Sequence, residues 1–338
     1  MEIPFSRYFA QGNEFHVLYK QLQERSLVHA CLITGEKGLG KKTLAFLMAE
    51  TLLCSGEGNR PCGRCKSCSY SRPQDNPDLI TIQRSTPLAP DGRKDRASIP
   101  VDDIREMIRL CGQHTVDGNA HVVLLLEADK MTVPAQNCLL KTLEEPPEDT
   151  YIFLVTEHPE ILLPTIISRC RTIRLKPWSR EVIHDVLLKR NGAASDRLQE
   201  AALLADGSIG TAISLMEDED YWKQREEIIR QFFQTGSRSE IIRISAHWKD
   251  RKNDADTLIS VLESVIHMML QHRYHPEKTP VPAFLPAGWQ KYSETASEAR
   301  FSLLLDTIRD AKRQMLSSVN FQAVIEKILF VLMGENVQ

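Results

Sequence analysis

Residues 31–43 contain the side chains that could act on a phosphate group. They read CLITGEKGLGKKT, an apolar strand that runs into a glycine-rich turn. In the pattern G-x-x-x-x-G-K-[ST], the backbone N–H groups of the turn surround a phosphate, the lysine reaches the outer phosphates, and a hydroxyl binds Mg²⁺. The sequence therefore predicts a nucleotide-binding phosphate loop that contains Gly35, Gly38, Gly40 and Lys41.

The last position of this pattern, which should hold the metal, differs in this chain. Lys42 occupies it, and the hydroxyl of Thr43 comes one residue later. A shift of one residue turns a helical side chain by about 100° around the helix axis. We therefore expect Thr43 to face away from a bound metal and Lys42 to place a cation where Mg²⁺ belongs, which weakens the expectation of ATP and Mg²⁺ binding.

A second departure from an ATPase lies at the end of the apolar run 121–126. In phosphate-loop enzymes this strand delivers an Asp to the metal, and in many of them a Glu that orients the attacking water follows it. Here Leu126 takes the Asp position and Glu127 takes the Glu position. Alternatively, Glu127 or Asp129 binds the metal from a position shifted along the chain, although the alternation of side chains along a strand disfavours this.

Four of the eight cysteines lie close together in a polar segment, with the spacing C-x7-C-x2-C-x2-C. The segment is rich in Gly, Ser, Lys and Arg, so it cannot build an apolar core of its own. Four thiolates on a short loop satisfy tetrahedral Zn²⁺, and the metal then supplies folding energy. We predict a structural zinc site; a disulfide pair, disfavoured in a reducing compartment, and an iron–sulfur cluster are the alternatives. The predicted ligands are Cys54, Cys62, Cys65 and Cys68.

Strands and helices must alternate around these residues to position them. Continuous apolar runs predict buried strands at 79–83, 121–126 and 151–155, and helical spacing predicts helices at 44–53, 101–113 and 133–145. This alternation indicates the α/β class, a doubly wound parallel sheet. The polar stretch 84–98 is expected to be a surface loop.

Beyond residue 176 the apolar positions have helical spacing alone. Helices are expected at 180–191, 195–216, 221–234, 238–248 and 254–273 and within 295–333, with a proline-rich loop at 276–288. The apolar face of the last helix, formed by Phe321, Val324, Ile328, Leu329 and Leu332, is expected to pack in a core.

Composition excludes several classes of protein. No apolar run approaches the roughly 20 residues that span a bilayer, and the N-terminus has no secretory signal pattern. We therefore expect no membrane contact and a cytoplasmic location. A net charge of −3 over 338 residues gives no field that would draw the chain onto DNA. A free-standing zinc DNA-binding module is therefore disfavoured.

Two longer segments point to a known family. Residues 137–147 read NCLLKTLEEPP and residues 163–170 read LPTIISRC, and both closely resemble the AAA+ subunits of bacterial DNA polymerase III clamp loaders. The cysteine segment 54–68 is similar to the zinc module that these subunits carry. The resemblance covers essentially the whole chain. It implies an AAA+ phosphate-loop domain at 1–176, a small helical lid domain at 177–217 and a helical collar domain for oligomerisation at 218–338.

Within this family the gamma and tau subunits are the ATPases, whereas the delta-prime type has often lost the hydrolytic groups. Lys42 and Leu126 favour the delta-prime type. The family's ATPases also carry a sensor Arg where this chain has Gly210, while Thr156 matches the other sensor position. The resemblance implies no ATPase activity of the chain itself, within a DNA polymerase III holoenzyme; an active gamma- or tau-like ATPase is the alternative.

The resemblance implies that this chain retains the arginine with which the family's subunits contact a neighbouring subunit. Ser168 and Arg169 match the family's SRC motif, whose Arg reaches the ATP of the adjacent gamma or tau subunit as an arginine finger in trans. The simpler interpretation of Arg169 is a solvated arginine at a helix end. The resemblance implies a stator in a hetero-oligomer with gamma or tau and delta subunits, which loads the sliding clamp onto primer-template DNA during replication.

Overall fold

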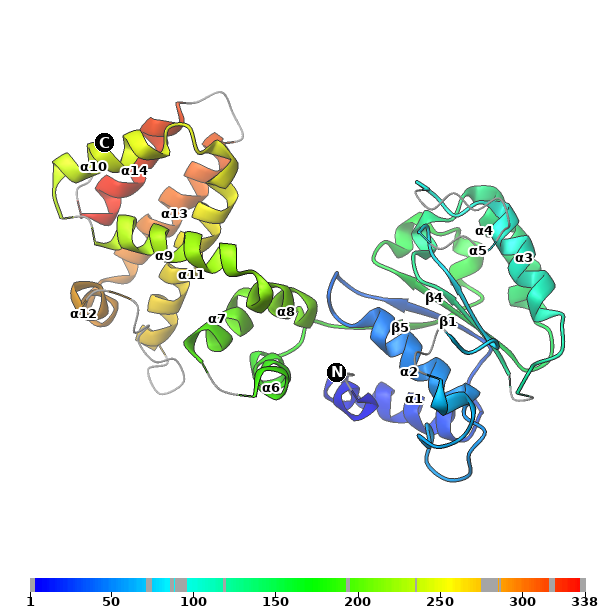
Figure 1. Cartoon of the computed structure of the whole chain (residues 1–338). Helices are drawn as coiled ribbons and strands as arrows, with labels where there is room; N and C mark the ends of the chain where they lie inside the picture. Colours follow the sequence, from blue (N-terminus) through cyan, green and yellow to red (C-terminus); the bar gives the residue numbers. More distant parts are fainter. Residues whose placement is uncertain are drawn as a thin grey trace. The chain divides into compact units, whose positions relative to one another are not determined.

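A computed structural model describes residues 4–70, 75–85, 88, 96–117, 120–192, 195–234, 236–274, 285, 287–315 and 320–334. The chain forms two compact units, Met1–Met216 and Glu217–Gln338 (Figure 1). No helix in the part of the chain that the structure describes is long and apolar enough to cross a membrane.

The first unit contains a five-stranded sheet, and every pairing within it is parallel. The strand order is β2-β3-β4-β1-β5. The strands are β1 (Ala30–Thr34), β2 (Leu79–Ile82), β3 (His121–Leu125), β4 (Thr150–Thr156) and β5 (Arg171–Arg174). The predicted parallel sheet is thus confirmed. The strands predicted at 79–83, 121–126 and 151–155 correspond to β2, β3 and β4, and each end agrees to within one residue. Strand β5 was not expected, because it has an arginine at each end and buries only Ile173.

Helices cover both faces of this sheet. One continuous apolar cluster joins alternate strand residues such as Leu32 and Val123 to α3 (Val101–Cys111), α4 (Val133–Glu144) and the short α5 (Pro164–Ile167). Because successive strand side chains point to opposite faces, the other face is left for α2 (Lys41–Leu53) and α1 (Asn13–Gln23), as Figure 1 shows. A short 3-10 helix, Phe5–Gln11, precedes α1.

Three further helices follow the sheet in the first unit: α6 (Arg180–Asn191), α7 (Asp196–Leu204) and α8 (Ile209–Glu217). The prediction of one helix over 195–216 is wrong. Asp206 and Gly207 have positive φ angles of 43° and 83°, a left-handed conformation that ends a helix. A Cβ on Gly207 would also lie 2.4 Å from a side-chain atom of Pro177.

The second unit is helical throughout its described residues. Its helices are α9 (Glu219–Phe233), α10 (Arg238–Trp248), α11 (Ala255–Tyr274), α12 (Ala287–Thr295), α13 (Glu298–Met315) and α14 (Phe321–Leu332). The stretch 295–333 is therefore two helices; residues 316–319 lie outside the described residues, and the Asn320 side chain caps α14 by accepting from the Gln322 N–H. The predicted apolar face of α14 is buried. Helix α12 was not expected, and most of the loop 276–288 lies outside the described residues.

Candidate functional site

The phosphate-loop sequence forms a turn between β1 and α2 that needs its glycines. Gly38 and Gly40 have φ angles of 77° and 91°, a region that L-residues rarely adopt. A Cβ on Gly35 would lie 2.8 Å from the carbonyl oxygen of Leu175, so Gly35 is required by packing. Gly38 and Gly40 line the cavity at this turn, and Gly35 does not.

That cavity has a volume of about 600 Å³ and lies at the carboxyl ends of the strands. The structure brings into it most of the predicted nucleotide-site residues: Gly38, Gly40, Lys41, Lys42, Thr43, Leu126, Glu127, Asp129, Thr156 and Gly210. Both Lys42 and Thr43 are among the residues that line the cavity. Lys42 adds a cation that the usual pattern lacks.

Lys41 is buried and already has acceptors within the chain. Its Nζ donates to the Glu36 carbonyl oxygen over 2.6 Å and to the Glu157 carboxylate over 3.3 Å. Burial lowers the pKa of Lys41, and the charge of Glu157 opposes that shift. The charge of Lys41 is thus partly balanced before any phosphate enters the cavity.

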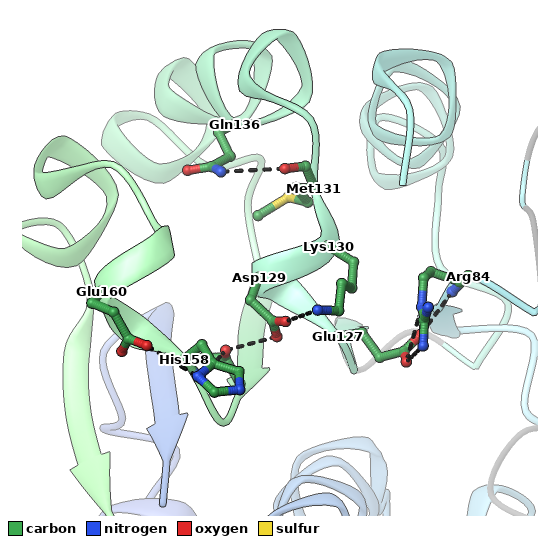
Figure 2. A network of polar contacts seen from close by, with 9 residues as sticks. Arg84, Glu127, Asp129, Lys130, Met131, Gln136, His158 and Glu160 are labelled. Carbon is green, nitrogen blue, oxygen red and sulfur yellow. Dashed lines mark hydrogen bonds and ion pairs between the residues drawn. The ribbon is translucent and has the colours of Figure 1, made fainter. Parts of the chain in front are cut away.

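Glu127 is held by an arginine. Figure 2 shows Arg84 facing the Glu127 carboxylate; Arg84 Nη2 donates to Oε1 over 2.8 Å, and the Arg84 backbone N–H donates to Oε2 over 3.0 Å. The hydrogen bonds from Arg84 lower the pKa of Glu127. A carboxylate neutralised in this way is a poor metal ligand and a poor base for water. Leu126, at the Asp position, is apolar and 8% exposed.

Asp129 also has partners for both of its oxygens. Thr156 Oγ1 donates to Oδ1 over 2.8 Å, and Lys130 Nζ lies 3.0 Å from Oδ2 (Figure 2). Burial alone would raise the pKa of Asp129, but the hydrogen bonds from Lys130 and Thr156 outweigh it and the pKa is lowered. Thr156 Oγ1 in turn accepts from the His158 N–H over 2.9 Å. Thr156 therefore orders the end of β4.

The four carbonyl groups of residues 37–40 accept hydrogen bonds from three separate places in the first unit: the start of α8, Trp178 and Tyr8. Ser208 Oγ donates to the Lys37 carbonyl oxygen over 3.1 Å, and the Gly210 N–H donates to that of Gly38 over 2.8 Å. The Trp178 Nε1–H donates to the Leu39 carbonyl oxygen over 2.9 Å, and the Tyr8 hydroxyl donates to that of Gly40 over 2.9 Å. The carbonyls of the loop are thus fixed toward these donors.

The resemblance places a sensor arginine of the family's ATPases at the position of Gly210, and a side chain would not fit there in this arrangement. A Cβ on Gly210 would lie 2.8 Å from the Cα of Gly38, a distance that real Cβ atoms do not show. The start of α8 and the phosphate loop therefore approach each other as closely as backbones can. An arginine at this position would require them to separate.

Sequence reasoning missed several charged residues of the cavity, among them Arg84 and Glu157. Arg84 was placed in a surface loop, although it follows the end of β2. In parallel sheets, ligands bind outside the carboxyl ends of the strands, and Glu157 follows β4 in the same way. Position directly after a strand was the signal that could have identified both residues.

Arg169 and Ser168 lie outside the cavity, just after α5. Arg169 Nε donates to Glu144 Oε1 over 2.7 Å, and Nη1 donates to the Thr165 carbonyl oxygen over 2.9 Å. The Arg169 side chain is 33% exposed. Ser168 Oγ donates to the same Thr165 carbonyl over 3.2 Å. This arginine does not serve the cavity of its own chain.

The four clustered cysteines form a compact group whose sulfur atoms all lie within 4.8 Å of one another. The cysteines are free. Cys54 and Cys65 Sγ are 3.9 Å apart, close to the roughly 3.8 Å that tetrahedral coordination at about 2.3 Å requires. Backbone N–H groups of Arg64 and Cys65 lower the pKa of Cys62, whereas burial raises the pKa of Cys54 and of Cys68. The donor set fits a tetrahedral metal.

Comparisons with known proteins give the family. A family described as DNA polymerase III, delta subunit, matches residues 10–179. The DNA polymerase III subunit delta' of Bacillus subtilis is 27% identical over 329 residues, which cover 95% of this chain and 96% of that protein. The subunit delta' of Escherichia coli is 35% identical over 216 residues, covering 64% of this chain and 62% of that protein.

The tau subunit of Escherichia coli DNA polymerase III is also similar. It is 34% identical over 195 residues, but these cover 56% of this chain and 29% of that protein. The delta' relatives are therefore matched over more of their length than tau. The chain belongs to the DNA polymerase III delta-subunit family, and within it to the delta-prime type.

Proposed function

We propose that this chain is a non-hydrolysing subunit of a clamp loader, which loads the sliding clamp onto primed DNA during replication. Membership of the delta-prime type supports this role. One observation carries the non-hydrolysing part: a phosphate-loop cavity in which both carboxylates near the metal position already hold cations, Glu127 to Arg84 and Asp129 to Lys130. Leu126 stands at the Asp position, and the third carboxylate among the described residues that line the cavity, Glu157, is paired with Lys41.

The chain would act on the nucleotide of its neighbour through Arg169. This arginine lies outside the cavity of its own chain and is partly exposed on its own surface. A guanidinium supplied from a neighbouring subunit stabilises the charge that develops on a transferring phosphoryl group, and it increases turnover by about 10³- to 10⁵-fold in other systems. The recipient would be a gamma or tau subunit, and delta would complete the hetero-oligomer.

The cysteine cluster would hold a structural Zn²⁺. Its ligands would be Cys54, Cys62, Cys65 and Cys68, whose sulfur atoms are already close enough for one metal. When bound, the metal would supply the folding energy that this polar loop lacks. The Arg60 backbone N–H donates to Gln23 Oε1 of α1, and the Arg60 side chain donates to the Gln23 carbonyl oxygen, which attaches the loop to the rest of the first unit.

The helical part of the chain would serve assembly. We propose that residues 1–176 form an AAA+ domain, residues 177–217 a lid domain and residues 218–338 a collar that joins the subunits into a ring. The contacts of α8 with the phosphate loop support the lid assignment. The all-helical composition of the second unit supports the collar.

The decisive experiment measures ATP hydrolysis by the chain alone and by the complex with gamma or tau and delta. We expect no turnover by the chain alone. In the complex, Arg169→Ala should lower turnover of the neighbouring site, whereas Lys41→Ala should change it little because no hydrolysis depends on the local cavity. Robust turnover by the isolated chain, abolished by Lys41→Ala, would instead identify an active gamma-like ATPase.

A further inference from the structure

One ion pair joins the two sequence segments that resemble the clamp-loader family. Glu144, the last residue of α4, belongs to NCLLKTLEEPP, and Arg169 belongs to LPTIISRC. They are 25 residues apart in sequence and form an ion pair on the surface of the first unit. We propose that Glu144 is the positioning residue of Arg169: it holds the guanidinium in the orientation in which it meets the neighbour's phosphate. This inference rests on the role of Arg169 proposed above.

The hydrogen bonds of Arg169 leave one edge of its guanidinium available. Nε and Nη2 both donate to Oε1 of Glu144, and Nη1 donates to the carbonyl oxygen of Thr165. A guanidinium has five N–H donors, so these contacts use three of them. One N–H on each terminal nitrogen remains without a partner among the described residues. Two N–H groups of a guanidinium can bind two oxygens of a phosphate.

The backbone that carries Arg169 is already fixed by the core. Ile166 of α5 is fully buried in the apolar cluster that includes α4, and the Leu163 N–H donates to the buried Gln136 side chain of α4 over 2.8 Å. The remaining freedom is in the long side chain of Arg169. Glu144 and the Thr165 carbonyl remove that freedom from two sides.

The ion pair orients Arg169 and still leaves it able to bind a phosphate. The side chains of Arg169 and Glu144 are 33% and 50% exposed, and ion pairs that solvent reaches are weak. Arg169 can therefore form a phosphate contact while it keeps the bond to Glu144. Because both hydrogen bonds end on Oε1, a single acceptor oxygen is sufficient, and the amide oxygen of a glutamine can replace it.

The test compares Glu144→Ala, Glu144→Gln and Arg169→Ala in the assembled complex, with ATP turnover measured at saturating amounts of the chain. Misplacement of a reacting group by about 1 Å can cost up to about 100-fold in rate, so we expect Glu144→Ala to lower kcat about 5- to 20-fold with an unchanged KM. Glu144→Gln should remain within about threefold of the unmodified complex, since it keeps one acceptor oxygen. Glu145→Gln, which removes the same charge one residue further along, should have no effect.

The possible outcomes separate this inference from the proposed function. If Arg169→Ala leaves turnover unchanged, the role of Arg169 as an arginine finger is refuted, and the positioning role of Glu144 is refuted as well. If Arg169→Ala lowers turnover but Glu144→Ala does not, or raises it, the finger stands and the positioning role is refuted. A loss in Glu144→Ala that disappears when more chain is added would show an effect on assembly and would likewise overturn the proposal.

Discussion

The close approach of Gly210 to the phosphate loop predicts a measurable cost for a single methyl group. In Gly210→Ala, the new Cβ would lie 2.8 Å from the Cα of Gly38 and 3.3 Å from its carbonyl oxygen. Neither neighbour is a flexible side chain, so the start of α8 must move away. Overpacking of this kind costs about 1–3 kcal/mol, and the better helix propensity of alanine returns at most about 1 kcal/mol.

We therefore expect Gly210→Ala to destabilise the first unit by about 1–2 kcal/mol. In a unit of 216 residues, this corresponds to a fall in Tm of about 2–8 °C. Thermal unfolding of the full chain measures the fall. Hydrogen exchange of the amide at position 210, which donates to the Gly38 carbonyl, should become faster because the start of α8 moves away from the loop.

The matched control is Gly112→Ala at the end of α3 in the same unit. Its Cβ would meet only the carbonyl oxygens of Arg109 and Ile108, at 3.5 and 3.7 Å, and its φ is −81°. This substitution should be neutral or stabilising by about 0.4–1 kcal/mol. If Gly210→Ala behaved like this control, the space at Gly210 would not be limiting, and the incompatibility of a sensor arginine with this structure would be refuted.

Three further predictions concern other contacts. Because Arg84 lowers the pKa of Glu127, the ion pair should stabilise the fold above the ordinary carboxyl pKa, and this stabilisation should be lost as the pH falls through the lowered pKa. In Arg84→Met, carboxyl NMR should show the pKa of Glu127 raised toward its ordinary value. An unchanged pKa would contradict the contact. Joint replacement of Cys62 and Cys65 by Ser should remove about one equivalent of zinc and destabilise the first unit locally; unchanged metal content would exclude these ligands. Tyr8→Phe removes the hydroxyl that donates to the loop and should cost about 1 kcal/mol in urea unfolding, and a smaller loss would mean that water replaces it.

The strands of the sheet could be predicted where burial on both faces leaves an uninterrupted apolar run, as in β3. Strand β5 could not, because its position at the edge of the sheet lets it bury only Ile173 and expose Thr172 and Arg174. The break between α7 and α8 falls at Asp206 and Gly207, whose Asp-Gly pair is a turn signal; it was missed because the helical spacing of apolar residues continues on both sides of the pair.

The candidate site could be predicted in part for a similar reason. The residues of the phosphate loop follow a local pattern, so their sequence spacing is sufficient to place them together. The pairing of Arg84 with Glu127 depends on β2 lying beside β3, which sequence spacing does not contain. The same holds for Glu144 and Arg169, which meet only because α5 packs against α4.

The four hydrogen-bonded carbonyls of the phosphate loop have a consequence for coupling. A ligand moves a conformational equilibrium only to the extent that it binds one state better than the other. In this chain, side chains and backbone from elsewhere in the first unit already hold residues 37–40 in one arrangement. A phosphate that entered the cavity would meet a loop already held in this arrangement, so little of its binding free energy would go into reshaping residues 37–40.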